Sequence, residues 1–482
     1  MVYPSFLKPG PLLARLRIRR KPSDLGEARR EQGPGRSDRE RLGDTLIRGA
    51  SGALAVRLVG TGLAFGLQVL LARLLGVEGY GVYIYAFSLV AFLSVLLKLG
   101  LDAATVRFLP TYLAGGHWGM MRGLLRRTLE IQTASSLLGA LGMLAVVWLL
   151  RRRLDPDLYH TLLVATPLLP MLTLQFLAEA RLRALSRVTL GRIPQEILQP
   201  LAVGSLAYAA LALAGDGFEA PLAMGATGLA VAAAVAIGFG LFHGIVPREV
   251  LAAAPEHRTR DWTKTALQLS LVASGSVVMA QIDVLLSGYY LGTAPAGTYS
   301  VASRISRFVP FGLTAVNLAI SPMVARLWSE GRHTELQRIV TLAAAGIILT
   351  TLPVSLACAL FADPLLGLFG GEFTEARGAL VVLVVGRTFG AFSGPTSLLL
   401  SMTGHQLLVV KVLGVSAVID IALHVVLLPR FGILGAAAAT TTTLVVWNLV
   451  LAYFVLRRMR LDPTVFSMLR PRNWRSEHSP GG

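Results

Sequence analysis

The sequence has little charge and almost no cysteine. Only 15% of its 482 residues are charged, whereas a soluble globular domain typically carries about 25%. The single cysteine, Cys358, excludes an intrachain disulfide and any metal cluster held by several cysteines. In place of charge the chain has 54% hydrophobic residues and a mean hydropathy of +0.62. This balance is typical of a chain that lies within a membrane.

The sequence also has no motif that identifies an enzyme. We find no Walker A sequence, no HExxH pair and no Cys/His spacing that suits a metal. Asp155, Pro156 and Asp157 resemble the acid-x-acid site of membrane glycosyltransferases, but Asp-Pro-Asp is also common in turns. No long external loop accompanies these residues to bind a sugar. We therefore expect no catalytic residue, no cofactor and no metal.

Apolar runs near 20 residues recur along the chain, and each is long enough to cross a hydrocarbon core about 30 Å thick. They predict an all-α integral membrane protein with about twelve transmembrane helices. A polar stretch at 247–262 is predicted to be a cytoplasmic linker between two six-helix bundles, 48–246 and 263–456. The predicted spans are 48–74, 80–101, 127–150, 159–184, 190–214, 219–246, 263–290, 297–325, 336–361, 376–402, 405–428 and 433–456.

A short glycine-bearing turn occurs once in each predicted bundle. LGVEGYGVYIYA at 75–86 matches LGTAPAGTYSVA at 291–302 with a constant offset of 216 residues. Each copy joins the first two spans of its bundle, which indicates a parallel internal repeat with its axis along the membrane normal. The glycines suit a tight turn, where positive φ and close backbone approach are needed. The identical pairs are Leu75/Leu291, Gly76/Gly292, Gly81/Gly297, Tyr83/Tyr299 and Ala86/Ala302.

The net charge of +18 comes from Lys and Arg that gather in the tails and between the apolar runs. Most of these loops alternate as the positive-inside rule requires, which places both termini in the cytoplasm. One loop disagrees, because RRRLDPD at 151–157 becomes external. No nucleic-acid-binding motif accompanies the charge, so we expect no nucleic-acid partner. Residues 1–47 lack an apolar signal region and are predicted to form a basic, disordered tail, and residues 457–482 a second basic tail.

Polar residues inside two predicted spans recur at helical spacing. Interhelical hydrogen bonds would explain either stripe alone. Cationic residues in both halves favour a shared cavity that takes an anionic substrate. The offset of 216 carries Thr314 back to Lys98, which should therefore face the same cavity. The stripe at 297–325 comprises Ser303, Arg307, Pro310, Thr314, Asn317 and Ser321, with Arg304 beside it, and the stripe at 48–74 comprises Arg57, Thr61, Ala64 and Gln68.

Other ionisable residues in the spans have more than one explanation. Arg73 and Arg387 are read as membrane-interface anchors whose side chains snorkel to the surface. Asp420 and His424 lie one helical turn apart, with Ser416 a further turn away. They are predicted either to share a proton near neutral pH or to form a static buried pair. Asp283 is a buried acid in the predicted seventh span.

Three segments resemble the polysaccharide-biosynthesis flippases of the Wzx type, which belong to the multidrug/oligosaccharidyl-lipid/polysaccharide exporter superfamily. The resemblance covers about residues 48–457. It implies two bundles arranged as a V around a central cavity, and alternating access that moves a lipid-linked oligosaccharide outward. The segments are LLARLLGVEGYGVY (70–83), QIDVLLSGYYLGTAPAGTYSVASRI (281–305) and RFGILGAAAAT (430–440).

The resemblance also implies a substrate, partners and roles for residues. The substrate would be an oligosaccharide on undecaprenyl pyrophosphate in the bacterial inner membrane, destined for O-antigen, lipopolysaccharide or exopolysaccharide. A polymerase or glycosyltransferases would be protein partners. Candidate coupling or structural pairs are Asp283 and Asp420–His424, and the candidate substrate-binding residues are Arg57, Lys98, Arg304, Arg307, Gln68 and Asn317.

Two other functions stay open. A drug/cation antiporter of the same superfamily would need an acidic or aromatic cavity, because an arginine-lined one repels cations. A membrane glycosyltransferase or polymer ligase would need an external catalytic acid, for which Asp155 and Asp157 are the visible candidates.

Overall fold

The computed structural model describes residues 36–468, and every element in that range is helical. Predictions for residues 1–35 and 469–482 lie outside the described residues. Residues 36–47 were expected to be disordered, but α1 already begins at Arg36. The prolines that would stop a helix lie upstream, the last of them at Pro34, so nothing interrupts α1 before its first apolar turns. The described residues divide into two compact units, 36–52 and 53–468, and the packing below lies within the second.

The first half of the chain contains eight α-helices. Short π and 3₁₀ segments, η2 (Pro194–Leu198) and η3 (Gly215–Gly217), lie on either side of α7. The helices are α1 (Arg36–Leu97), α2 (Leu101–Gly115), α3 (Trp118–Leu149), α4 (Pro156–Ala165), α5 (Leu168–Ala184), α6 (Val188–Ile193), α7 (Gln199–Ala214) and α8 (Ala220–Ile245).

The second half follows through a short helix, α9 (Arg248–Ala252). Two 3₁₀ segments, η4 (Gly371–Ala376) and η5 (Val465–Met468), precede α15 and follow α17. The helices are α10 (Thr259–Leu291), α11 (Thr293–Ser306), α12 (Phe311–Ser329), α13 (His333–Leu360), α14 (Ala362–Gly367), α15 (Arg377–Phe392), α16 (Thr396–Met402) and α17 (Gln406–Met459).

Eight helical segments of the described chain are long and apolar enough to cross a membrane, or nine if the bent pair at 371–402 counts as one span. This confirms an all-α fold of membrane-spanning type, while the count of twelve stays a prediction. Two of the helical segments, α1 and α17, cover two predicted spans each. In both, a single non-helical residue separates the two spans. These residues are Gly76 in α1 and Gly432 in α17, with φ of 65° and 58°.

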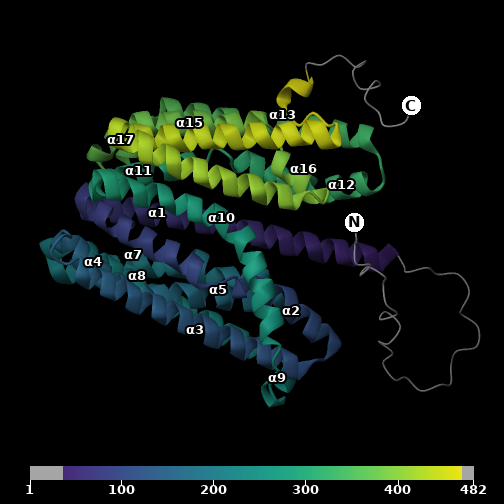
Figure 1. Cartoon of the computed structure of the whole chain (residues 1–482), viewed down its shortest axis with the longest axis horizontal. Helices are drawn as coiled ribbons and strands as arrows, with labels where there is room; N and C mark the ends of the chain where they lie inside the picture. The colour runs from purple at the N-terminus through teal and green to yellow at the C-terminus, as the bar shows by residue number, and fades with distance from the viewer. Residues whose placement is uncertain (1–35, 469–482) are drawn as a thin grey trace, which may run out of the picture. The chain divides into compact units, whose positions relative to one another are not determined.

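The helices pack in two groups (Figure 1). In the first, α5 packs against α2, α3 and α8, and α8 also contacts α4 and α7. In the second, α17 packs against α10, α15 and α16, while α13 contacts α12 and α15. A contact between α2 and α10 joins the groups. Superposition of the two groups as a repeat stays a prediction.

The repeated turns have the same backbone conformation. Gly76 has φ 65° and ψ −176°, and Gly292 has φ 93° and ψ 170°. Both φ values fall where only glycine is free of steric cost. Gly81 approaches the Thr293 carbonyl so closely that an added Cβ would overlap it. Both reasons for glycine expected from the sequence, positive φ and close approach, are therefore present.

The repeated tyrosines form the same kind of hydrogen bond. The Tyr83 hydroxyl lies 3.0 Å from the Thr227 hydroxyl on α8. The Tyr299 hydroxyl lies 2.9 Å from the Thr440 hydroxyl on α17. All four residues are buried or nearly so. Each turn is thus attached to the last long helix of its own group by a tyrosine–threonine pair.

The predicted linker and the start of the predicted C-terminal tail both pack against the helices. In the linker, Trp262 is buried and donates to the Tyr112 hydroxyl at 2.9 Å. After α17, the Asp462 amide donates to Gln337 of α13 at 2.8 Å, and Gln337 donates back to the Asp462 carbonyl at 2.9 Å. Residues 460–468 are therefore part of the folded domain and not of a free tail.

Candidate functional site: two adjoining polar cavities

One cavity, here called the α1–α12 cavity, has a volume of about 480 Å³ and is rich in arginine. Arg57 comes from α1, Arg304 from the last turn of α11 and Arg307 from the residue that follows α11. Its lining residues include no Asp or Glu. They are Arg57, Leu58, Thr61, Ala64, Phe65, Arg304, Arg307, Phe308, Pro310, Phe311, Thr314, Ala315, Asn317, Leu318, Ser321 and Leu398.

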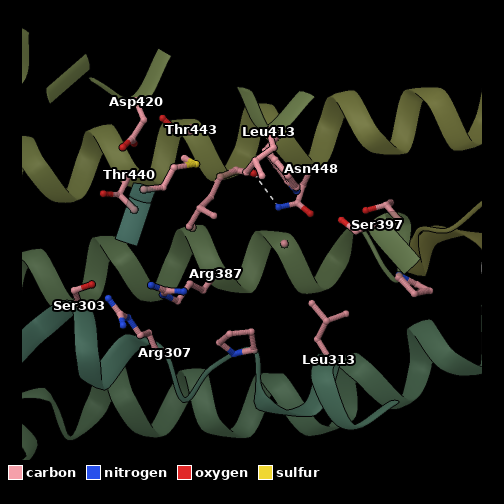
Figure 2. A pocket seen from close by; sticks show the side chains of 18 of the residues that line it. Ser303, Arg307, Leu313, Arg387, Ser397, Leu413, Asp420, Thr440, Thr443 and Asn448 are labelled. Carbon is pink, nitrogen blue, oxygen red and sulfur yellow. Dashed lines mark hydrogen bonds between the residues drawn. The ribbon is translucent and has the colours of Figure 1, made fainter. Parts of the chain in front are cut away.

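A second cavity, here called the α15–α17 cavity, has a volume of about 560 Å³ and mixed polarity. Figure 2 shows the labelled side chains of Arg307, Arg387 and Asn448 around it. Two acids, Asp283 and Asp420, also line it. The two cavities share Arg307, Pro310 and Asn317 in their walls. The other polar or aromatic lining residues are Ser303, Thr396, Ser397, Thr440, Thr443 and Trp447.

The predicted eighth span is interrupted beside two of the cavity arginines, Arg304 and Arg307. Helix α11 ends at Ser306 and α12 begins at Phe311. Pro310 ends this break, and its missing N–H removes one hydrogen bond of a continuous helix. Arg307 is exposed to the cavities, while Ser306 and Val309 beside it are buried. All six members of the predicted stripe from Ser303 to Ser321 line one cavity or the other.

Arg387 is a cavity residue that the sequence reading missed. It was interpreted as an interface anchor, but it is half-buried on α15 and lines the α15–α17 cavity. Its Nε donates to the Ser306 hydroxyl at 2.8 Å. Arg73 also differs from a simple anchor, because its Nε donates to the Leu368 carbonyl at 2.6 Å. Trp447 and Asn448 of α17 are further lining residues that the sequence reading did not identify.

Lys98 does not line either of these two cavities, so its expected position on the shared cavity face is not observed, and a role in substrate binding stays a prediction. Its ammonium lies 2.8 Å from a carboxylate oxygen of Asp102 and 5.0 Å from the centre of the Phe176 ring. Both charged residues are buried. The helix breaks here, with Leu99 and Gly100 at positive φ. In the second half the break falls at 307–310, so the 216-residue offset does not carry a helix face from Thr314 to Lys98.

Gln68 also lies apart from both cavities. It is buried, and its side-chain oxygen accepts a hydrogen bond of 2.9 Å from the Tyr80 hydroxyl. Three other members of the same predicted stripe, Arg57, Thr61 and Ala64, do line the α1–α12 cavity. Gln68 therefore joins the two arms of the first hairpin, and its predicted role in substrate binding stays a prediction.

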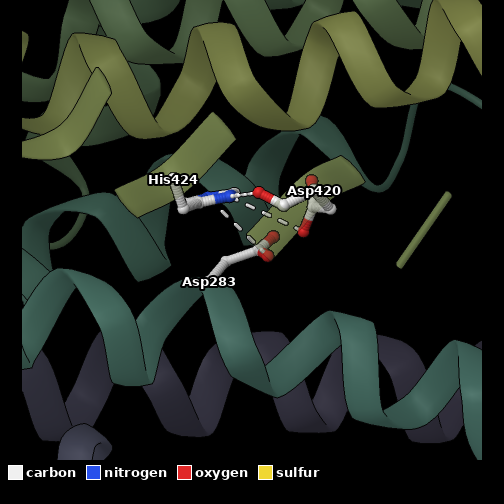
Figure 3. Close-up of side chains that lie close together, drawn as sticks. All are labelled: Asp283, Asp420 and His424. Carbon is white, nitrogen blue, oxygen red and sulfur yellow. Dashed lines mark hydrogen bonds and ion pairs between the residues drawn. The ribbon is translucent and has the colours of Figure 1, made fainter. Parts of the chain in front are cut away.

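Asp283, Asp420 and His424 form a buried cluster (Figure 3). One ligand atom from each lies within 4.8 Å of the other two. His424 Nε2 is 3.8 Å from Asp283, and His424 Nδ1 is 3.6 Å from the Asp420 carboxylate. Thr440 donates to Asp283 at 3.3 Å. The cluster could bind a proton or a small cation, because two neighbouring buried carboxylates repel one another unless positive charge lies between them.

The one candidate for a catalytic acid pair is a helix cap. The Asp155 side chain accepts a hydrogen bond of 2.9 Å from the Asp157 amide, and Pro156 is the first residue of α4. An acid that caps the first turn and a proline at the first helical position are ordinary helix-start chemistry.

Apolar helices long enough to cross a membrane enclose two cavities lined with arginine, which is the architecture of a multi-pass membrane protein. The family model of the polysaccharide biosynthesis proteins matches residues 46–328, and the chain belongs to this family. The MatE model matches residues 270–426.

Named relatives share part of this sequence, and solved structures share its fold. A probable low-salt glycan biosynthesis flippase of Haloferax volcanii, Agl15, is 26% identical over 199 residues, which are 39% of this chain and 40% of the relative. The chain thus matches about two fifths of that protein's length. An inward-facing multidrug resistance MATE transporter superposes with TM-score 0.69, at 16% identity, over 85% of this chain and 98% of its own. The lipid II flippase MurJ, inward closed, gives 0.61 at 14% identity, over 85% and 87%.

Proposed function

We propose that the protein moves an anionic polyprenyl-pyrophosphate-linked oligosaccharide across the bacterial cytoplasmic membrane by alternating access. The observation that carries this proposal is the lining of the α1–α12 cavity, where Arg57, Arg304 and Arg307 occur with no acidic residue. Arginine suits a pyrophosphate because its planar fork binds two oxygens at once and stays charged at any physiological pH. The glycan flippase among the relatives supports a substrate of this class.

The acidic cluster is proposed to couple transport to a proton or a cation. It lies in the wall of the second cavity, where Asp283 and Asp420 are close to Arg307 and Arg387. Its His424 Nε2 and Asp283 Oδ1 have no hydrogen-bond partner among the described residues. A buried polar atom without a partner is costly in a resting structure, which supports a role for this cluster in binding a positive charge.

The drug/cation antiporter remains the alternative that a specific observation favours. Asp283 and Asp420 would attract a cation to the α15–α17 cavity. Two arginines line the same cavity, and three line its neighbour, so a cationic drug would meet net positive charge on its way. An anionic substrate fits this distribution better.

Replacement of Arg304 or Arg307 by alanine tests the proposal in cells. Loss of one charged hydrogen bond costs about 1.5–3 kcal/mol, or about ten- to a hundredfold in binding. Export of surface polysaccharide should fall accordingly while the protein still inserts. Lysine should restore part of the activity, since it restores the charge but not the fork. Arg326→Ala is a matched control, because Arg326 is exposed and paired with Glu330. Full export by the Arg57/Arg304/Arg307 triple alanine variant would overturn the proposal.

A further inference from the structure

The two cavities differ in charge although they adjoin. The α1–α12 cavity is lined by three arginines and no acid. The α15–α17 cavity is lined by two arginines and two aspartates, so its formal charges balance. The first favours an anion, whereas a phosphate in the second would be repelled by Asp283 and Asp420. The second cavity therefore suits a neutral polar ligand.

The polar groups of the α15–α17 cavity are those that bind hydroxyls. Asn317 and Asn448 reach it from α12 and α17, and Trp447 of α17 supplies an aromatic surface. Asn448 is held in place by its own helix, through a hydrogen bond of 2.8 Å from Nδ2 to the Leu444 carbonyl (Figure 2). Amides and carboxylates accept hydrogen bonds from hydroxyls, and an aromatic ring can pack against the apolar face of a sugar.

The Asn317 side-chain oxygen is buried and has no hydrogen-bond partner among the described residues. Buried carbonyl oxygens are nearly always paired, so an unpaired one marks a place where a donor from a ligand or water binds. Asn317 lines both cavities, together with Arg307. These two side chains therefore lie where the cavities adjoin. The volume of about 560 Å³ lies within the range of small-molecule sites, about 300–1,000 Å³.

We propose that the α15–α17 cavity is a sugar subsite, which holds the sugars nearest the pyrophosphate while the arginines of the α1–α12 cavity hold the pyrophosphate itself. The inference rests on the proposed function and assigns the two parts of the substrate to separate cavities. Asn448 and Trp447 set the preference for a glycosylated carrier over a bare one. Arg307 and Asn317 stand at the junction, beside the bond between pyrophosphate and sugar.

The test compares two kinds of probe on the purified full-length protein in lipid nanodiscs. One probe is farnesyl pyrophosphate, and the others are farnesyl pyrophosphates that carry glucose, N-acetylglucosamine or glucuronic acid. Glucose or N-acetylglucosamine, which are neutral, should tighten binding about tenfold or more, and the anionic glucuronic acid should tighten it less. Asn448→Ala and Trp447→Ala should each remove about two- to tenfold of this gain, as expected for one neutral contact, and leave the affinity for farnesyl pyrophosphate unchanged. Arg304→Ala should weaken all probes equally.

The outcomes separate this inference from the function on which it rests. If no sugar tightens binding, or if Asn448→Ala and Trp447→Ala weaken the bare and glycosylated probes alike, the sugar subsite is wrong. If farnesyl pyrophosphate does not bind, or binds equally well to Arg304→Ala, the result contradicts the proposed function itself and not only the sugar subsite. Trp447→Phe and Asn448→Ser are milder substitutions, and they replace the alanine variants in the same comparison if an alanine variant does not fold. Trp328→Ala is the matched control, because Trp328 lies outside both cavities.

Discussion

Gly81 and Gly297, which a 216-residue offset relates in the sequence, touch one another in the structure. A Cβ atom on Gly297 would lie 2.7 Å from the Cα of Gly81, and one on Gly81 would overlap the Thr293 carbonyl. The two repeated hairpins therefore meet where neither has a side chain. Under the proposed orientation this contact closes the external side, so it should separate when the transporter opens outward.

Gly81→Val is expected to hinder this contact and to populate the outward-open state. The reporter is a Thr314→Cys substitution in a Cys358→Ser background, because Thr314 lines the α1–α12 cavity. Labelling by an impermeant maleimide from outside should increase severalfold over the parent. Gly62→Val is the control, since a Cβ there meets no described atom within 4 Å. Unchanged labelling in a folded Gly81→Val variant would argue against a gate at the hairpins.

The proposed membrane orientation can be tested with single cysteines in the same background. Reagents that cannot cross the membrane should label positions in 215–220 and 363–375 from outside but not positions in 250–262. The arginine loop at 151–153 makes the test worthwhile, because positive-inside counting places it on the wrong side. In the structure Arg151 packs 4.6 Å from the centre of the Trp148 ring, an arrangement suited to a membrane interface. External labelling of 250–262 would mean that the topology is inverted.

Lys98 should be needed for stability and not for substrate affinity. Removal of one partner from a buried ion pair typically costs about 3–5 kcal/mol, because the other charge is left unpaired. Lys98→Met should therefore lower the melting temperature clearly, and Lys98→Met combined with Asp102→Leu should recover much of the loss. Probe affinity should stay the same in any variant that folds. A stable Lys98→Met protein with weakened binding of farnesyl pyrophosphate would return Lys98 to the substrate site.

Asp420→Asn tests the coupling role of the acidic cluster. Asn keeps the size of the side chain but removes the charge, and Asp420 is buried beside Asp283 and His424. If the cluster binds the driving ion, transport by the variant should lose its dependence on pH or sodium. Transport should be measured in proteoliposomes across a proton gradient and, separately, a sodium gradient. Normal transport with the wild-type ion dependence would leave Asp420 and His424 as a static pair.

Local sequence patterns were sufficient to predict the helical membrane fold, the hairpins and most residues of the two polar stripes that line the cavities. Glycine at positions 76 and 292 indicates a turn, because glycine adopts positive φ without steric cost. Arg307 and Asn317 belong to a stripe that recurs at helical spacing. Lys98 lies outside both cavities because the helix breaks fall at different positions in the two halves. A residue-by-residue match of the two halves does not reveal this difference. Gln68 bonds to Tyr80 across the first turn, a contact that depends on how the hairpin closes.

Two further features of the site can be recognised in the sequence. Arg387 lies eleven residues into the predicted span 376–402, about 16 Å along a helix, which is too deep for a side chain to reach the near surface. Thr440, Thr443 and Trp447 recur at helical spacing in the predicted span 433–456, with Asn448 adjacent, and so share one face. Their apposition to α12 and α15 depends on tertiary packing and could not be read from either segment alone.

The most direct test of anion transport is flipping in proteoliposomes. The probe is a short-chain polyprenyl pyrophosphate that carries a fluorescent oligosaccharide, and dithionite quenching reports which leaflet it occupies. Wild-type protein should bring the probe to equilibrium between leaflets, while the Arg57/Arg304/Arg307 triple alanine variant should be at least about a hundredfold slower, given about 1.5–3 kcal/mol for each charged contact. The triple lysine variant should fall between them. Equal rates for wild type and triple alanine, or transport of a cationic dye in preference to the lipid, would contradict an anion-binding flippase.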